Sequence, residues 1–191
     1  METATYVDLP LDEFLDRLAA ERRAPGGGSA AALTVALAGS LVAMVARSSR
    51  NSWTDAGGVA AQAQALVERV VPLVHADALV WEQAAAALEE TGAGDAALER
   101  KLEAAAAVPI RIAEAAADAA SLAQVAAERG DGAYRADAVA AAILATAGAE
   151  AAAHLVAVNL AVREGDERLA RARTSAEAAR DAATRALDGI G

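Results

Sequence analysis

Apolar residues recur along the chain with the spacing of amphipathic helices, and no stretch alternates apolar and polar residues as a strand would. In the first such segment, residues 11–18, the large apolar side chains share one face and acidic residues occupy the first turn. The pattern therefore predicts a short amphipathic helix. Its apolar face consists of Leu11, Phe14, Leu15 and Leu18.

The charge-free run of residues 30–46 predicts a second helix, over about residues 29–48, that is apolar nearly all round. A helix of this kind lies at the centre of a bundle or between subunits. It is long enough to cross a membrane, but its many Ala and Gly residues and the charges elsewhere in the chain favour a buried helix and no membrane. One of its stripes consists of Leu33, Leu37, Leu41 and Met44.

Glycine-containing breaks divide the rest of the chain into four further predicted helices. The last of them carries only two large apolar residues and is predicted to be a mainly solvated outer helix. The four cover about residues 59–90, 95–129, 134–164 and 165–187.

Two prolines, Pro72 and Pro109, lie well inside predicted helices. Proline lacks the N–H of its ladder hydrogen bond, so each predicts a bend and leaves a carbonyl without a helical donor. That carbonyl could face a pocket or water. A simple kink with no ligand is the alternative.

The composition strengthens the helical prediction: 55% of the 191 residues are hydrophobic but only 3% are aromatic, and alanine supplies most of the apolar count. Such a chain reads as helix throughout. The prediction is a single all-α domain, residues 1–191, built as a bundle of five to six helices. Each buried alanine contributes only about 0.8 kcal/mol, so we also expect tight helix packing and an oligomer, in the simplest case a homodimer.

The net charge of −10 argues against nucleic-acid binding, because phosphates require clustered Lys and Arg. The chain has no cysteine, which excludes disulfides and thiolate metal sites. The N-terminal residues lack the basic start and apolar core of a signal peptide, so a cytoplasmic location is expected.

The glycine run Gly26, Gly27 and Gly28, followed by Ser29, stands directly before the charge-free helix. Three residues without a Cβ leave the backbone bare, and a serine is a common helix opener. The unpaired amides of a helix N-terminus could then reach an anion or a planar polar ligand. The alternative is a helix corner in which the glycines only allow close approach to a neighbouring helix.

Asp77 lies in the middle of a predicted apolar helix, one turn before Trp81 and on the same face. A carboxylate beside an indole would be partly desolvated, which raises its pKa and suits it to proton transfer or to pairing with a cation. The alternative is that Asp77 faces water.

The predicted helix over residues 134–164 carries four polar candidates. Asp137 and Asn159 share a face but are separated by about 33 Å along the axis, so they do not form one site. Glu150 and His154 are adjacent on another face, where a carboxylate–imidazole pair is geometrically allowed. Because the chain has only one other histidine, no metal site is expected.

Taken together, these motifs resemble the cyclodeaminase/cyclohydrolase family. This is the family of the C-terminal domain of formimidoyltransferase-cyclodeaminase and its stand-alone bacterial relatives, including methenyltetrahydrofolate cyclohydrolases. The similar segments occur in the family's order and cover nearly the whole chain. They are residues 14–18, 25–31 leading to 44–46, 77–81, 108–110, and Asp137 followed by 158–160.

The resemblance implies an all-helical, dimer-forming domain that acts on the one-carbon unit of a tetrahydrofolate derivative, with no tightly bound cofactor and no metal. Asp77 becomes the candidate acid/base, and Gly26, Gly27, Gly28 and Ser29 would present backbone amides to the folate. Asp137 and Asn159 are further candidates for the ligand pocket. Whether the chain is a cyclodeaminase, a cyclohydrolase or a non-catalytic relative that binds a small ligand or serves as a scaffold is left open.

Overall fold

The computed structural model describes residues 5–21, 24–90, 96–160 and 165–188. The described residues form six α-helices and two short 3-10 turns and include no strand, which confirms the all-α prediction. The helices are α1 (Leu11–Ala19), α2 (Gly27–Ser48), α3 (Ala56–Glu90), α4 (Ala96–Arg129), α5 (Arg135–Asn159) and α6 (Glu167–Asp188). The 3-10 turns are η1 (Tyr6–Asp8) and η2 (Gly132–Tyr134).

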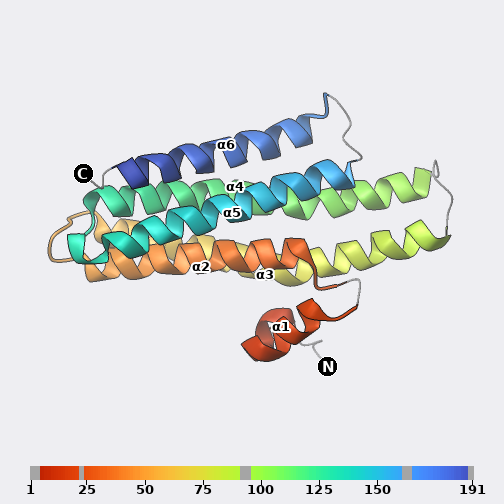
Figure 1. Ribbon diagram of the computed structural model, residues 1–191, viewed down its shortest axis with the longest axis horizontal. Helices are drawn as coiled ribbons and strands as arrows, with labels where there is room; N and C mark the ends of the chain where they lie inside the picture. Colours follow the sequence, from red (N-terminus) through yellow and green to blue (C-terminus); the bar gives the residue numbers. More distant parts are fainter. Residues whose placement is uncertain (1–4, 22–23, 91–95, 161–164, 189–191) are drawn as a thin grey trace.

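The five long helices lie side by side along the long axis of the molecule (Figure 1). Helices α2, α3, α4 and α5 pack on one another, and α6 covers α4 and α5 on the side away from α2 and α3. The short α1 stands apart, near α2 and α3, and η1 contacts α3. Most predicted helix boundaries lie within three residues of the observed ones, but α5 ends at Asn159 and residues 161–164 lie outside the described part of the chain.

Small residues set the distance between the two central helices. The buried face of α5 is built almost entirely from alanine, with Gly148 in its middle. A Cβ on Gly148 would lie 2.5 Å from Cγ2 of Val35 and 3.4 Å from the carbonyl oxygen of Ala31, so α5 approaches α2 too closely for any side chain there. Close packing of small residues thus supplies contact area that large core side chains provide in other bundles.

Helix α6 is the mainly exposed outer helix that the sequence predicts. Its inner face is buried against α4 and α5 and consists of Leu169 and six alanines. An alanine stripe carries little hydropathy signal, so the periodicity of the charged residues outweighs it in the sequence. The alanines are Ala172, Ala176, Ala179, Ala182, Ala183 and Ala186.

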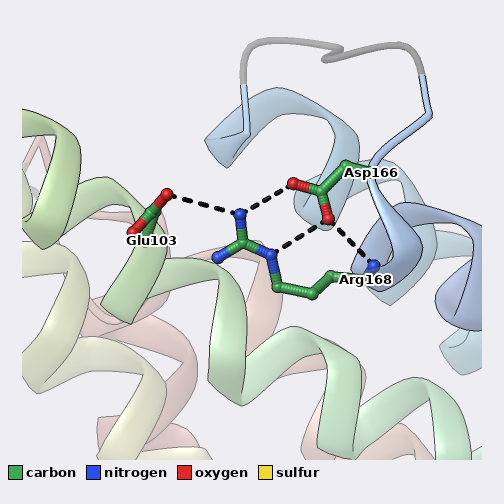
Figure 2. Close-up of polar contacts among 3 residues, drawn as sticks. All are labelled: Glu103, Asp166 and Arg168. Carbon is green, nitrogen blue, oxygen red and sulfur yellow. Dashed lines mark hydrogen bonds and ion pairs between the residues drawn. The ribbon is translucent and has the colours of Figure 1, made fainter.

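The first turn of α6 is tied to α4 by three charged residues (Figure 2). Asp166 accepts hydrogen bonds from the backbone N–H of Arg168 at 2.9 Å and from its guanidinium at 2.7 and 3.0 Å. Nη2 of Arg168 also lies 3.4 Å from Oε1 of Glu103 on α4. Hydrogen bonding to Asp166 raises the pKa of Arg168 above its usual value.

Helix α1 is the short amphipathic helix that the sequence predicts, but only part of its apolar face is buried. Phe14 is buried, but Leu11 on the same predicted face is 64% exposed and Leu15 is exposed as well. The reason is that α1 sits at the edge of the bundle, where only part of its apolar face meets other helices.

By length and composition, the segments Gly27–Ser48 and Gly132–Asn159 could each cross a bilayer, a property that buried core helices share. Both lie in the middle of the bundle, where α2 packs against α5. Their outer faces nevertheless leave Leu37 and Ile143 about half exposed, at 52% and 49%.

The packing of α5 on α2 gives a first prediction. Replacing Gly148 with alanine should lower the free energy of unfolding by about 1–3 kcal/mol, because the added methyl overlaps Val35 and forces the helices apart. Urea denaturation followed by circular dichroism measures the change. Gly57→Ala, in the first turn of α3 with nothing within 4 Å, is the matched control and should be neutral or stabilising. Equal effects of the two substitutions would contradict the close-packing explanation.

Candidate functional site

The site is built around the N-terminus of α2. Gly26 is the N-cap residue in an extended conformation, and the first intrahelical bond runs from the N–H of Ala30 to the carbonyl of Gly26, at 3.0 Å. The amides of Gly27, Gly28 and Ser29 therefore have no partner within the helix.

Ser29 does not open the helix as expected. It is the third helical residue, it is fully buried, and its Oγ donates a hydrogen bond to the carbonyl oxygen of Val74 on α3 at 2.8 Å. The hydroxyl thus links two helices instead of capping one. The sequence cannot distinguish a serine that bonds to another helix from a serine that caps its own helix, because either one stands near a helix start.

Gly28 of α2 lies directly against the side chain of Asp77 on α3. A Cβ on Gly28 would overlap the carboxylate of Asp77, meeting Cγ and both oxygens. The carboxylate therefore occupies the space that any side chain at position 28 would fill. Asp77 can reach the start of α2 only because residue 28 is glycine.

The environment of Asp77 changes its acidity. The residue is only 7% exposed, and burial raises its pKa from 3.8 to about 6. Hydrogen bonding from the backbone amide of Ser29 acts in the opposite direction, and the Ser29 hydroxyl, whose proton goes to Val74, lies beside the carboxylate. Desolvation outweighs this polar contact, so Asp77 titrates near neutral pH.

A cavity of about 270 Å³ opens beside this carboxylate. Its walls come from the start of α2, the middle of α3, the α4 segment around its proline, and the end of α5. Most of the wall is apolar, and no Lys, Arg or His is among the described residues that line it. The lining residues are Gly26, Gly27, Gly28, Asp77, Trp81, Ala105, Pro109, Leu155, Val158 and Asn159.

On the side formed by α4 and α5, Asn159 is held by a buried hydrogen bond. Its Nδ2 donates to the carbonyl oxygen of Ala105 at 3.0 Å. Ala105 precedes Pro109 by four residues, so this is the carbonyl that the proline leaves without a helical donor. The freed carbonyl expected from the sequence thus lies at a pocket, whereas Pro72 in α3 is exposed.

Comparisons with known proteins show the family and the fold of the chain. The family model described as Formiminotransferase-cyclodeaminase matches residues 10–180. The chain belongs to this family. This confirms the resemblance found in the sequence motifs.

Among solved structures, formiminotetrahydrofolate cyclodeaminase from Thermotoga maritima is similar with a TM-score of 0.82. It shares 24% sequence identity over 95% of this chain and 97% of that chain, which shows that the two have the same fold. No curated protein matches the sequence significantly.

In this family member, the fold brings most of the predicted site residues together. Gly26, Gly27, Gly28, Asp77 and Asn159 all line the one cavity, although they come from three different helices. The close-approach interpretation of the glycine run holds at Gly28, where a Cβ would overlap Asp77. A Cβ on Gly26 would meet nothing within 4 Å and one on Gly27 would contact Leu155, and binding of a ligand by their amides stays a prediction. Asp77 does not face bulk water.

Two predicted site residues lie elsewhere. The amide of Ser29 faces Asp77, so this residue supports the carboxylate from behind the cavity wall. Asp137 is half-buried in the first turn of α5, whereas Asn159 is the last residue of that helix, and Asp137 does not line the cavity. Sharing a helical face does not bring residues at opposite ends of a helix together.

The structure adds lining residues that the sequence did not single out. Leu155 lies one helical turn before Asn159, so the spacing could have indicated that it lines the same cavity. Val158 is adjacent to Asn159 in the sequence. Ala105 carried no signal, because its role comes from its carbonyl group.

The Glu150–His154 pair is not formed. Glu150 makes an ion pair with Arg180 of α6, and His154 is exposed. Among the described residues, no group of three His, Cys, Asp or Glu side chains is placed to hold a metal ion.

The pKa of Asp77 gives a second prediction. Because the folded protein holds this proton more tightly than the unfolded chain, the contribution of Asp77 to the free energy of unfolding falls as pH rises from about 4 to about 6 and is level above. In Asp77→Asn this loss is absent. Relative to wild type, the variant should gain up to about 3 kcal/mol between pH 4 and pH 7.

Urea denaturation across this pH range measures the gain. Asp181→Asn, on the exposed face of α6, is the matched control and should leave the pH profile unchanged. If the profiles of wild type and Asp77→Asn run parallel, the carboxylate is not desolvated in the folded state.

Proposed function

We propose that the protein is a cytoplasmic enzyme of folate one-carbon chemistry, either a cyclodeaminase or a methenyltetrahydrofolate cyclohydrolase. Membership of the family and the shared fold with a formiminotetrahydrofolate cyclodeaminase support this class of substrate. The observation that carries the proposal is the buried carboxylate of Asp77, whose pKa is raised to about 6. It borders a cavity that is also lined by Gly27 and Gly28, whose amides have no partner within the helix.

Asp77 is suited to the proton transfers of either reaction. In the cyclodeaminase reaction, N10 of 5-formimino-tetrahydrofolate attacks the formimino carbon, and the tetrahedral intermediate expels ammonia once its nitrogen is protonated. In the cyclohydrolase reaction, water adds to the methenyl carbon and loses one proton to a base. The bond from that carbon to N5 then breaks as the remaining hydroxyl proton is transferred to N5, which gives 10-formyl-tetrahydrofolate. A group with a pKa near 6 can donate a proton in the first case and accept one in the second.

The remaining walls of the cavity fit the same chemistry. The one-carbon unit is a cationic amidinium in the methenyl form, and the Asp77 carboxylate would stabilise this charge in a mostly apolar cavity. The amides at the start of α2 can donate hydrogen bonds to oxygen or nitrogen atoms of the ligand. These residues need neither a metal ion nor a tightly bound cofactor to perform the proton transfers.

The cavity volume indicates which part of a folate enters. At about 270 Å³ it is just below the range of roughly 300–1,000 Å³ found for drug-sized ligands. It therefore suits the reduced pterin and its one-carbon unit, with the rest of the folate lying outside.

The functional prediction follows from the role given to Asp77. The purified protein should convert methenyl-tetrahydrofolate faster than buffer alone, and the loss of near-ultraviolet absorbance of this compound measures the rate. Alternatively, it should release ammonia from 5-formimino-tetrahydrofolate. Asp77→Asn should lower kcat by roughly 100-fold or more, because it removes the proton-transfer group. The control Asp181→Asn should retain wild-type activity.

The outcomes separate the candidate functions. No acceleration by wild type of either reaction, together with a folate-dependent rise in melting temperature, would identify a non-catalytic binding protein. If wild type shows neither acceleration nor a folate-dependent rise in melting temperature, folate is excluded as its ligand.

We also propose that the protein is a homodimer whose interface is the outer face of α2 and α5. Gly27 contacts Leu155, and Gly148 fits against Val35, so the helices run antiparallel and place Leu37 and Ile143 at about the same height of the bundle. Within one turn of Leu37 and of Ile143, neither helix carries a charged residue. Two copies with a net charge of −10 repel each other least when they meet across an uncharged surface.

This interface gives a further prediction. Leu37→Glu should convert the dimer to a monomer, since it places a charge on the exposed apolar face of α2. Light scattering measures the mass, and circular dichroism checks that the helices remain. Leu187→Glu replaces a similarly exposed leucine on α6 and should leave the mass unchanged. A monomeric wild-type protein would refute the proposal.

A further inference from the structure

The side of the cavity opposite α2 contains a polar pair that the proposed proton transfers do not use. Pro109 is fully buried in the middle of α4, and the carbonyl oxygen of Ala105 therefore receives no N–H from its own helix. An unpaired buried carbonyl is costly, and here Nδ2 of Asn159 satisfies it from α5 at 3.0 Å.

This bond fixes which way the Asn159 amide points. A backbone carbonyl can only accept, so the nitrogen of the amide must face Ala105. Turning the amide over would bring two oxygens together at a buried site and leave both without a donor. With Nδ2 directed at α4, Oδ1 is the end of the amide left for the cavity that Asn159 lines.

We infer that Asn159 is a specificity-determining residue that presents a hydrogen-bond acceptor to an N–H group of the bound folate, and that Pro109 is the positioning residue that orients it. The identity of the ligand in this inference rests on the proposed function. Chemically, the reduced pterin and its one-carbon unit carry several N–H donors, and the backbone amides at the start of α2 cannot accept from them.

Asn159 differs from Asp77 in a way that matters for recognition. The Asn159 oxygen is a neutral acceptor whose strength does not change with pH, whereas the Asp77 carboxylate exchanges a proton near pH 6. One side of the cavity can thus hold the ligand in place while the other transfers protons. A ligand that presented an acceptor to Oδ1 would leave two buried oxygens unpaired and would bind weakly.

The test compares Asn159→Ala, Pro109→Ala and the double variant. The probe is 5-formyl-tetrahydrofolate, and its dissociation constant is measured from the quenching of tryptophan fluorescence, since Trp81 lines the cavity. Asn159→Ala should weaken binding roughly 3- to 10-fold, the loss expected for one neutral hydrogen bond, and should change KM more than kcat. Pro109→Ala gives Ala105 a helical donor and should weaken binding about 2- to 4-fold, because the amide is no longer held.

The double variant identifies coupling. If Pro109 acts through Asn159, then Pro109→Ala should cause no further loss of binding in the Asn159→Ala background. In ligand-free protein labelled with nitrogen-15, the side-chain amide protons of Asn159 should be protected from exchange with water, and Pro109→Ala should remove this protection. Melting temperatures show whether each variant is folded.

The results distinguish the two proposals. Additive losses, or unprotected amide protons in wild type, would overturn the positioning role of Pro109 whatever the activity. Wild-type binding that Asn159→Ala leaves unchanged would overturn the recognition role while the enzyme proposal stands. If wild type binds no 5-formyl-tetrahydrofolate and has no folate activity, the proposed function and the recognition role both fail.

Discussion

The contact between the carboxylate of Asp77 and the backbone of Gly28 is the constraint on which the site depends. The carboxylate fills the space of the missing Cβ, a position that a side chain at residue 28 would deny it. This close approach buries Asp77, raises its pKa and places it beside the unpaired amides of the helix N-terminus. One missing side chain thereby determines the acidity of the proposed catalytic group.

Small side chains also determine the packing of the whole bundle. Alanine faces on α5 and α6 and the glycine at position 148 let helices lie close together, so dispersion contacts replace large core residues. The consequence appears on the outside of α2 and α5, where large apolar side chains such as Leu37 and Ile143 stay half exposed. A protein whose core contains few large apolar side chains gains stability when such exposed side chains are buried in an oligomer. The alanine-rich packing is therefore consistent with the proposed homodimer.

Stability and function oppose each other at Asp77. Holding a carboxylate at a pKa of about 6 destabilises the folded protein at neutral pH relative to a neutral side chain of the same shape. Proteins keep such groups where the perturbed pKa serves a reaction. On the opposite wall, the gap left by Pro109 is satisfied by Asn159, so the polar groups there do not add a second cost.

Much of this protein was determined by local sequence patterns. The helical class, the positions of five long helices, the glycine turn and the shared face of Asp77 and Trp81 all follow from periodicity and from the lack of a Cβ in glycine, which act over a few residues. The tertiary structure decided which of these features meet. Ser29 bonds to Val74 and Asn159 to Ala105 across 45 and 54 residues, and Asp137 is left far from the cavity. Alanine faces are nearly identical to one another, so only the packed fold selects which helix lies against which.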